Sequence, residues 1–164
     1  VQTLLTLHPD IAIMNEGAND ARLPLSAGRY FRLIQTLVNV ANTVGIKPVL
    51  TTIVPTCRNH SILLGSIQTY NNALREIASA NSVPLADVDH AFRTTCDVNN
   101  CYLMNLPEGL HPNTRGYDVF GEVVQATLLG INIFAPDGPT LLAQATGVAP
   151  TDIITRPDPV APAQ

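Results

Sequence analysis

Apolar residues along the chain follow two patterns, short continuous runs and longer segments with a helical repeat. The run at residues 10–14 (DIAIM) follows a proline and is typical of a buried strand in a parallel sheet. Residues 48–54 have the same character, and residues 85–88 form a shorter run. We therefore predict three strands in these places.

Amphipathic helices are predicted between and after these runs. Residues 23–44 carry one apolar face, with Ser26 as a candidate N-cap and Gly45 as a stop. A second helix is marked by Ile67, Tyr70, Leu74 and Ile77. The last is marked by Tyr117, Phe120, Val124 and Leu128, with Asn113 or Thr114 as its cap.

Strands that alternate with helices predict an α/β fold, a flavodoxin-like three-layer α/β/α sandwich around a parallel sheet. Such a domain would cover residues 1–134. From Ala135 the helical repeat breaks, and residues 135–164 read as a Pro-rich linker or disordered tail, leading to any further domain. Residues 141–147 could add one or two helical turns.

Composition narrows the class of protein. Hydrophobic residues make up 46% of the 164 residues and charged residues 13%, which argues against disorder for most of the length. The formal net charge is −4 and the basic residues are scattered, so neither a nucleic-acid partner nor a membrane surface is indicated. No apolar run is long enough for a membrane span.

The cysteines are Cys57, Cys96 and Cys101. Cys96 and Cys101 bracket a short polar loop and could close it as a disulfide, or all three could be free thiols. A disulfide would favour a secreted or extracytoplasmic protein, although nothing in the sequence fixes the location. Neither the cysteine spacing nor the separated histidines predict a metal site.

Two motifs carry candidate chemistry. Glu108 stands three residues before His111 in a Pro/Gly-rich loop, as an acid that orients a general base would. Gly17 and Asn19 follow the first predicted strand and offer a backbone N–H and a side-chain amide, the donors of an oxyanion hole. In parallel sheets, ligands bind at the carboxyl ends of the strands, so both motifs are expected on one rim.

These motifs resemble two blocks of the SGNH, or GDSL-type, esterases and lipases. Gly17, Asn19 and Asp20 match the Gly-x-Asn-Asp block, and His111-Pro112-Asn113 with Gly116-Tyr117 matches the later His block. Residues 70–75 resemble the helix between them. The resemblance covers roughly residues 9–134, and it implies ester hydrolysis by a serine mechanism without a metal or an organic cofactor.

The chain departs from the family pattern in two ways. Glu108 stands where the family has aspartate, which leaves Asp97 and Asp118 as alternative partners of His111. The Gly-Asp-Ser block that supplies the nucleophile has no match, so a domain incomplete at its amino terminus, inactive by itself, is expected. His8, His60 and His90 lie outside the motifs and are interpreted as non-catalytic.

Two functions remain open at the level of the sequence. The resemblance implies a hydrolase of small acyl or acetyl esters, including those on carbohydrates. The missing serine block instead favours a non-catalytic module that keeps the fold for binding.

Overall fold

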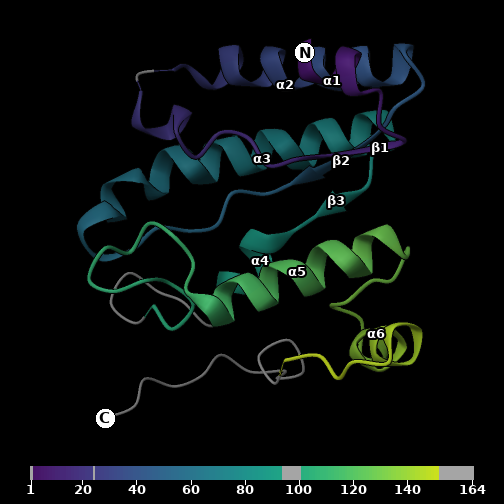
Figure 1. The fold of residues 1–164 in the computed structure, drawn as a ribbon. Helices are drawn as coiled ribbons and strands as arrows, with labels where there is room; N and C mark the ends of the chain where they lie inside the picture. The colour runs from purple at the N-terminus through teal and green to yellow at the C-terminus, as the bar shows by residue number, and fades with distance from the viewer. Residues whose placement is uncertain (1, 24, 94–100, 152–164) are drawn as a thin grey trace. The chain divides into compact units, whose positions relative to one another are not determined.

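The computed structural model describes residues 2–23, 25–93 and 101–151 (Figure 1). In chain order its elements are α1 (Gln2–Leu7), β1 (Ile11–Met14), η1 (Asp20–Arg22), α2 (Ala27–Thr43), β2 (Lys47–Thr51), η2 (Arg58–Leu63), α3 (Leu64–Asn81), β3 (Leu85–Ala86), α4 (Val88–Arg93), α5 (Thr114–Leu128) and α6 (Gly138–Thr146), where η marks a 3-10 helix. Two compact units share them: Val1–Ile53 with Gly65–Leu85, and Val54–Leu64 with Ala86–Gln164. We call these the first and the second unit.

The strands form one sheet in the order β1-β2-β3, and β1 runs parallel to β2 (Figure 1). The register pairs Ile13 with Val49 and Met14 with Leu50. Helix α2 connects the two strands, as a parallel crossover requires. The predicted α/β class with a parallel sheet is confirmed.

Strand β1 is less buried than its apolar run predicts. Ala12 and Met14 are buried, whereas Ile11 and Ile13 are 45% and 47% exposed. Side chains of a strand alternate between its two faces, so one face of β1 meets the core and the other is half open.

Helix α2 has the termini that its sequence predicts, although it begins later than residue 23. The Ser26 side chain accepts a hydrogen bond from the Arg29 N–H, and Ser26 itself is extended. At the other end Gly45 has a φ of +77°, the left-handed conformation that stops a helix. Leu25 stays outside the helix, because its carbonyl accepts a hydrogen bond from the Tyr70 hydroxyl.

The second unit contains α4, α5 and α6 around its own apolar core. Phe92, Leu103, Val119 and Leu142 are among its buried members. Strand β3 ends earlier than the predicted residue 88, because Val88 already begins α4. Helix α4 was not predicted from the sequence.

Helix α6 lies in the first part of residues 135–164, which the sequence predicts as a linker or disordered tail with one or two helical turns at 141–147. Residues 138–146 form this helix, and its Leu142 is 2% exposed within the core of the second unit. Gly138 lies so close to the Asn132 carbonyl that an added Cβ would sit 2.2 Å from its oxygen. The start of the predicted tail is therefore packed structure, while residues 152–164 lie outside the described ranges.

In the described ranges, none of the helices has the length and apolar character that crossing a membrane would take.

Candidate active site

The loop after β1 places Gly17 in a conformation and a space that admit only glycine. Its φ is +116°, a region that other residues rarely adopt. A Cβ at this position would lie 2.7 Å from Tyr30 Oη and 2.8 Å from Ile53 Cδ1. The Gly17 carbonyl accepts a hydrogen bond from the Ala21 N–H at 3.0 Å, which turns the chain into η1.

Two stacked tyrosines support this loop. The rings of Tyr30 and Tyr70 lie 4.1 Å apart with an interplanar angle of 12°. The Tyr30 hydroxyl donates to the Glu16 carbonyl at 2.9 Å, and the Tyr70 hydroxyl donates to the Leu25 carbonyl at 2.8 Å. The two phenols thereby fix both ends of the loop that contains Gly17 and Asn19.

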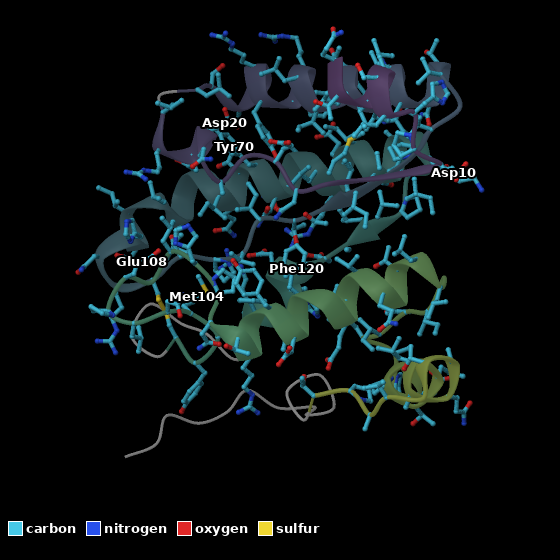
Figure 2. The ribbon with its side chains drawn as sticks, viewed as in Figure 1. Asp10, Asp20, Tyr70, Met104, Glu108 and Phe120 are labelled. Atoms are coloured by element: carbon cyan, nitrogen blue, oxygen red, sulfur yellow. A yellow bond between two sulfur atoms is a disulfide. The ribbon has the colours of Figure 1, made fainter. Side chains whose placement is uncertain are left out.

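Both phenols have a raised pKa. Burial is the main cause for Tyr30, and the nearby carboxylates of Asp20 and Glu16 and the Tyr70 phenol raise its pKa further. Burial and Asp20 raise the pKa of Tyr70 in the same direction. Figure 2 labels Asp20 and Tyr70 next to each other in the first unit. A raised pKa keeps each hydroxyl protonated at neutral pH, so each remains a donor to its carbonyl.

Asn19 precedes η1, but its side chain does not cap the helix. A turn-capping role would be the ordinary structural reason for an asparagine after a strand. Asn19 is exposed, and its amide is not used in that way. Asp20 begins η1 and accepts a hydrogen bond from the Leu23 N–H through its carbonyl, which agrees with a structural role.

In the second unit, residues 103–113 fold back on themselves and carry Glu108 and His111. Met104 pairs with Pro112 in an antiparallel bridge, and the Asn105 N–H donates to the His111 carbonyl at 2.8 Å. The Leu106–Pro107 peptide bond is cis. We call this segment the His111 loop; Figure 2 labels Met104 and Glu108 within it.

Asn113 joins the His111 loop to α5. Its side-chain oxygen accepts from the Gly116 N–H at 2.9 Å and caps the helix, which settles the choice between Asn113 and Thr114. Its amide donates to the carbonyls of Tyr102 and Met104. One side chain therefore fixes the end of the loop and the first turn of the helix.

The Glu108 carboxylate accepts a hydrogen bond from Nδ1 of His111. This is the contact that the three-residue spacing predicts. The His111 side chain is 63% exposed and that of Glu108 is 39% exposed, so the second ring nitrogen, Nε2, can reach a ligand in solvent. A carboxylate on Nδ1 fixes the tautomer that leaves Nε2 as an acceptor. Asp97 lies outside the described residues.

The segment from Cys57 to His60 holds the His111 loop in place. The Cys57 N–H donates to the Gly109 carbonyl at 2.9 Å, and His60 Nδ1 donates to the Glu108 carbonyl at 2.7 Å. Gly109 has a φ of +70°, and a Cβ there would lie 2.4 Å from the Cys57 oxygen. Only glycine permits this close approach.

The disulfide predicted between Cys96 and Cys101 is corrected by the structure. Cys101 is bonded to Cys57, 44 residues away, and both are buried. Cys96 lies outside the described residues. The short spacing of residues 96 and 101 was a misleading guide, because the fold brings Cys57, the residue before η2, to Cys101.

A cleft of about 470 Å³ opens beside the His111 loop within the second unit. Its walls combine apolar and polar side chains: Arg58, Cys101, Tyr102, Met104, Asn105, Leu106 and Asn113. Asn105 and Asn113 flank His111 along the chain and through the hydrogen bonds given above. The cleft offers space for a small organic group beside this loop.

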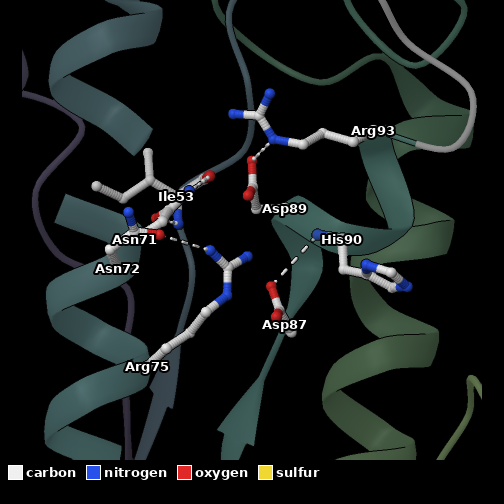
Figure 3. Close-up of polar contacts among 8 residues, drawn as sticks. All are labelled: Ile53, Asn71, Asn72, Arg75, Asp87, Asp89, His90 and Arg93. Atoms are coloured by element: carbon white, nitrogen blue, oxygen red, sulfur yellow. Dashed lines mark hydrogen bonds and ion pairs between the residues drawn. The ribbon is translucent and has the colours of Figure 1, made fainter. Parts of the chain in front are cut away.

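The remaining histidines and acids have structural surroundings. The His90 N–H donates to the Asp87 carboxylate at 3.3 Å (Figure 3). The His90 and Phe134 rings make a T-shaped contact. Asp89 is buried and pairs with Arg93 at 2.8 Å. Across the described ranges, no three His, Cys, Asp or Glu side chains gather in a way that could hold a metal ion.

The site residues divide between the two units. Gly17 and Asn19 belong to the first unit, and Glu108 and His111 belong to the second. The geometry of each pair is described within its own unit. Their convergence on one rim stays a prediction.

Comparison with known proteins identifies the family. The sequence model of the GDSL-like lipase/acylhydrolase family matches residues 1–119, which include both motifs. The chain belongs to this family. No curated protein sequence matches this GDSL-like chain.

Solved structures show that the GDSL-like fold is shared. A GDSL-like lipase from Bacteroides thetaiotaomicron has a TM-score of 0.68 at 21% identity, over 79% of this chain and 67% of the other. A lipase/acylhydrolase from Enterococcus faecalis has 0.65 at 18%, over 77% and 65%. An acetylxylan esterase from Geobacillus stearothermophilus has 0.64 at 16%, over 76% and 62%. This chain thus spans about two thirds of their length.

The GDSL-like motifs did not reveal every residue that shapes the site. Cys57 and His60 act through backbone contacts with residues about 50 positions later, and no local pattern marks such contacts. Tyr30 lies within residues 23–44, for which the sequence predicts only an amphipathic helix. Its hydroxyl, placed under the Gly17 loop, is the feature that sequence reasoning missed.

Proposed function

We propose that this protein contributes the general base and the oxyanion donors of a serine-type hydrolase of carboxylic esters. The observation that carries the proposal is the hydrogen bond between the Glu108 carboxylate and His111 Nδ1, within the part of the chain that matches the GDSL-like family. The paired acid and imidazole are the arrangement that acyl transfer requires.

In this mechanism His111 Nε2 takes the proton of a serine hydroxyl as the oxygen attacks the acyl carbon, and later returns it to the leaving alcohol. Glu108 fixes the tautomer and stabilises the imidazolium that forms. The exposure of the His111 ring supports this assignment, because Nε2 must reach both the nucleophile and the substrate.

Gly17 and Asn19 are proposed to stabilise the oxyanion of the tetrahedral intermediate through the Gly17 N–H and the Asn19 amide. Two features support the roles: the Tyr30 hydroxyl holds the loop, and the Asn19 side chain is exposed and does not cap η1. Preorganised donors are worth about 3–4 kcal/mol each at the transition state.

The nucleophile is proposed to be a serine from outside these 164 residues, because no Gly-Asp-Ser block occurs among them. Small acyl or acetyl esters, including acetylated carbohydrates, are the proposed substrates. The cleft beside the His111 loop and the similarity to an acetylxylan esterase support this class.

A second candidate is a non-catalytic module that uses the same fold for binding. The absence of a Gly-Asp-Ser block from the 164 residues favours it. The two candidates differ in whether the gene encodes such a block before Val1.

The test measures hydrolysis of short p-nitrophenyl esters by the 164-residue protein and by a version extended through any upstream Gly-Asp-Ser block. We expect no His111-dependent turnover from the 164 residues. In the extended protein, His111→Ala should lower kcat by roughly 10⁴-fold or more, and Glu108→Gln by roughly 10²–10⁴-fold. His90→Ala, away from the site, is the control and should retain activity.

An extended protein that carries the serine block but shows no His111-dependent hydrolysis would contradict the proposal. A gene without the block would favour the binding module. Turnover by the 164 residues that disappears in His111→Ala would show that a nucleophile lies within them.

A further inference from the structure

The backbone of Glu108 is held by a histidine from a distant part of the sequence. His60 Nδ1 lies 2.7 Å from the Glu108 carbonyl oxygen, and this ring is partly buried. A carbonyl oxygen can only accept, so Nδ1 must carry the proton and donate. The contact therefore fixes the tautomer of His60 as well as the position of Glu108.

His60 is itself held in place. The Thr56 hydroxyl donates to the His60 carbonyl at 2.8 Å, and the His60 N–H donates to the Cys57 carbonyl at 2.9 Å. The disulfide of Cys57 then ties this segment to Cys101, two residues before the His111 loop. The ring is thus a fixed support and not a loose surface side chain.

We propose that His60 is a positioning residue, whose hydrogen bond to the Glu108 carbonyl aims the Glu108 carboxylate at His111. A catalytic consequence of this contact rests on the proposed function, but the hydrogen bond between His60 and Glu108 does not depend on any reaction. The Glu108 carbonyl accepts from His60, and the next carbonyl, that of Gly109, accepts from the Cys57 N–H. Two adjacent hydrogen bonds keep the loop from rotating about a single bond. A longer acid needs such support, because a glutamate has one more rotatable bond than an aspartate.

The first experiment determines the tautomer of His60 by ¹⁵N NMR of the ring in the 164-residue protein near neutral pH. We expect a protonated Nδ1. If the neutral ring carries its proton on Nε2 alone, it cannot donate to Glu108, and the proposal is overturned.

The second experiment follows the hydrogen-bonded Nδ1 proton of His111 as a downfield ¹H resonance, assigned by its loss in Glu108→Gln. His60→Leu should abolish or broaden this signal in folded protein. His60→Asn should preserve it, because its amide can replace Nδ1–H as a donor. The matched control His90→Leu removes a histidine that touches Phe134 and should also preserve it.

An unchanged signal in folded His60→Leu, or a signal absent from folded His60→Asn, would overturn the proposal. A thermal melt of each variant reports folding separately. If His60→Leu fails to fold, the signal in His60→Asn and the tautomer of His60 still test the proposal. Neither NMR experiment needs hydrolysis, so an inactive protein would leave these results intact. Equally, a failed NMR test would not contradict hydrolysis by the extended protein.

Discussion

At the scale of single residues, Asn71 is a fully buried amide that completes the hydrogen bonding of the chain after β2. Its Oδ1 accepts from the Ile53 N–H and its Nδ2 donates to the Ile53 carbonyl, both at 2.8 Å (Figure 3). Asn71→Leu keeps the volume but leaves both backbone groups without a partner. We expect a loss of about 2–4 kcal/mol in the free energy of unfolding.

Asn72→Leu is the matched control, because Asn72 is exposed and makes only a 3.4 Å contact with Arg75. Urea unfolding of the two variants measures the difference. Equal stabilities would show that the Asn71 amide is not needed to satisfy Ile53.

A second residue-scale prediction concerns Gly17. Its positive φ and the contacts that a Cβ would make with Tyr30 and Ile53 should make Gly17→Ala destabilising by about 2–3 kcal/mol. Gly121→Ala is the control: this glycine lies inside α5 with no atom within 4 Å of the added Cβ. The control should stabilise by roughly 0.5–1 kcal/mol. Thermal melts of both variants check this, and a neutral Gly17→Ala would contradict it.

The contrast between Glu108 and Cys57 shows what sequence reveals about single residues. Glu108 and His111 are three positions apart, so their contact could be predicted from local spacing. Cys57 is bonded to Cys101, 44 positions away, and His60 contacts Glu108, 48 positions away. Partners at that separation are set by the packing of the whole unit, which no short motif encodes.

At the scale of elements, the disulfide between Cys57, which precedes η2, and Cys101, which precedes the His111 loop, should stabilise the second unit. It closes a loop of 44 residues, which corresponds to about 3–4 kcal/mol of lost chain entropy in the unfolded state. The double variant Cys57→Ser/Cys101→Ser should lose a large part of this stabilisation, measured as the free energy of unfolding. Cys96→Ser is the control, and should match the parent protein.

Peptide mapping without reduction gives an independent check of the pairing. A linked pair of peptides containing Cys57 and Cys101 is expected. Recovery of a Cys96–Cys101 link, or destabilisation by Cys96→Ser alone, would restore the pairing that the short spacing suggests.

A pH-dependent contact joins α5 to the segment after α6. The Glu122 carboxylate accepts from the Thr151 N–H at 2.7 Å and from its hydroxyl at 3.0 Å. Burial raises the pKa of Glu122, Asp118 raises it further, and the two Thr151 hydrogen bonds oppose the rise. The folded protein therefore holds this proton to higher pH than the unfolded chain does.

The ordinary pKa of a glutamate carboxyl is 4.5, and the pKa of Glu122 in the folded protein is higher. The contribution of Glu122 to stability is therefore present at low pH and is lost as the pH rises from 4.5 through the folded-state pKa. Glu122→Gln should flatten the stability curve in that window. Thermal melts from pH 4 to pH 7 compare this variant with the parent protein. A Glu122→Gln curve parallel to that of the parent protein would contradict the assignment.

Element boundaries were predictable where a local signal sets them. Ser26 and Gly45 fix the ends of α2, and Asn113 begins α5, because caps act within one turn. Helix α4 was missed, and α6 was expected only as one or two turns at residues 141–147, since six and nine residues give little periodicity. Their formation depends on the burial of Phe92 and Leu142 in a shared core.

At the scale of the whole molecule, the alternation of apolar runs and amphipathic helices was enough to predict the α/β class. The family match and the shared fold of the solved structures confirm it. The convergence of the two motifs could not be deduced beyond the rule that strand ends share a rim. That rule places loops on one edge of a sheet, but it does not give the distance between Asn19 and His111.

Strand β1 carries the last prediction, which concerns association of the molecule. In the described part of the chain β1 is an edge of the sheet, and its outer face presents Ile11 and Ile13 about half exposed. An open edge with exposed β-branched residues is a template for pairing with another strand. We expect the 164-residue protein to associate increasingly with concentration.

Ile13→Lys should weaken this association roughly tenfold or more, because a buried charge costs several kcal/mol and each 1.4 kcal/mol is a factor of ten. Ile62→Lys is the matched control, since Ile62 is 87% exposed on η2, which is not part of a strand. Sedimentation over a range of concentrations measures both variants. A monomeric parent protein at high concentration, or equal effects of the two substitutions, would show that β1 is not the associating edge.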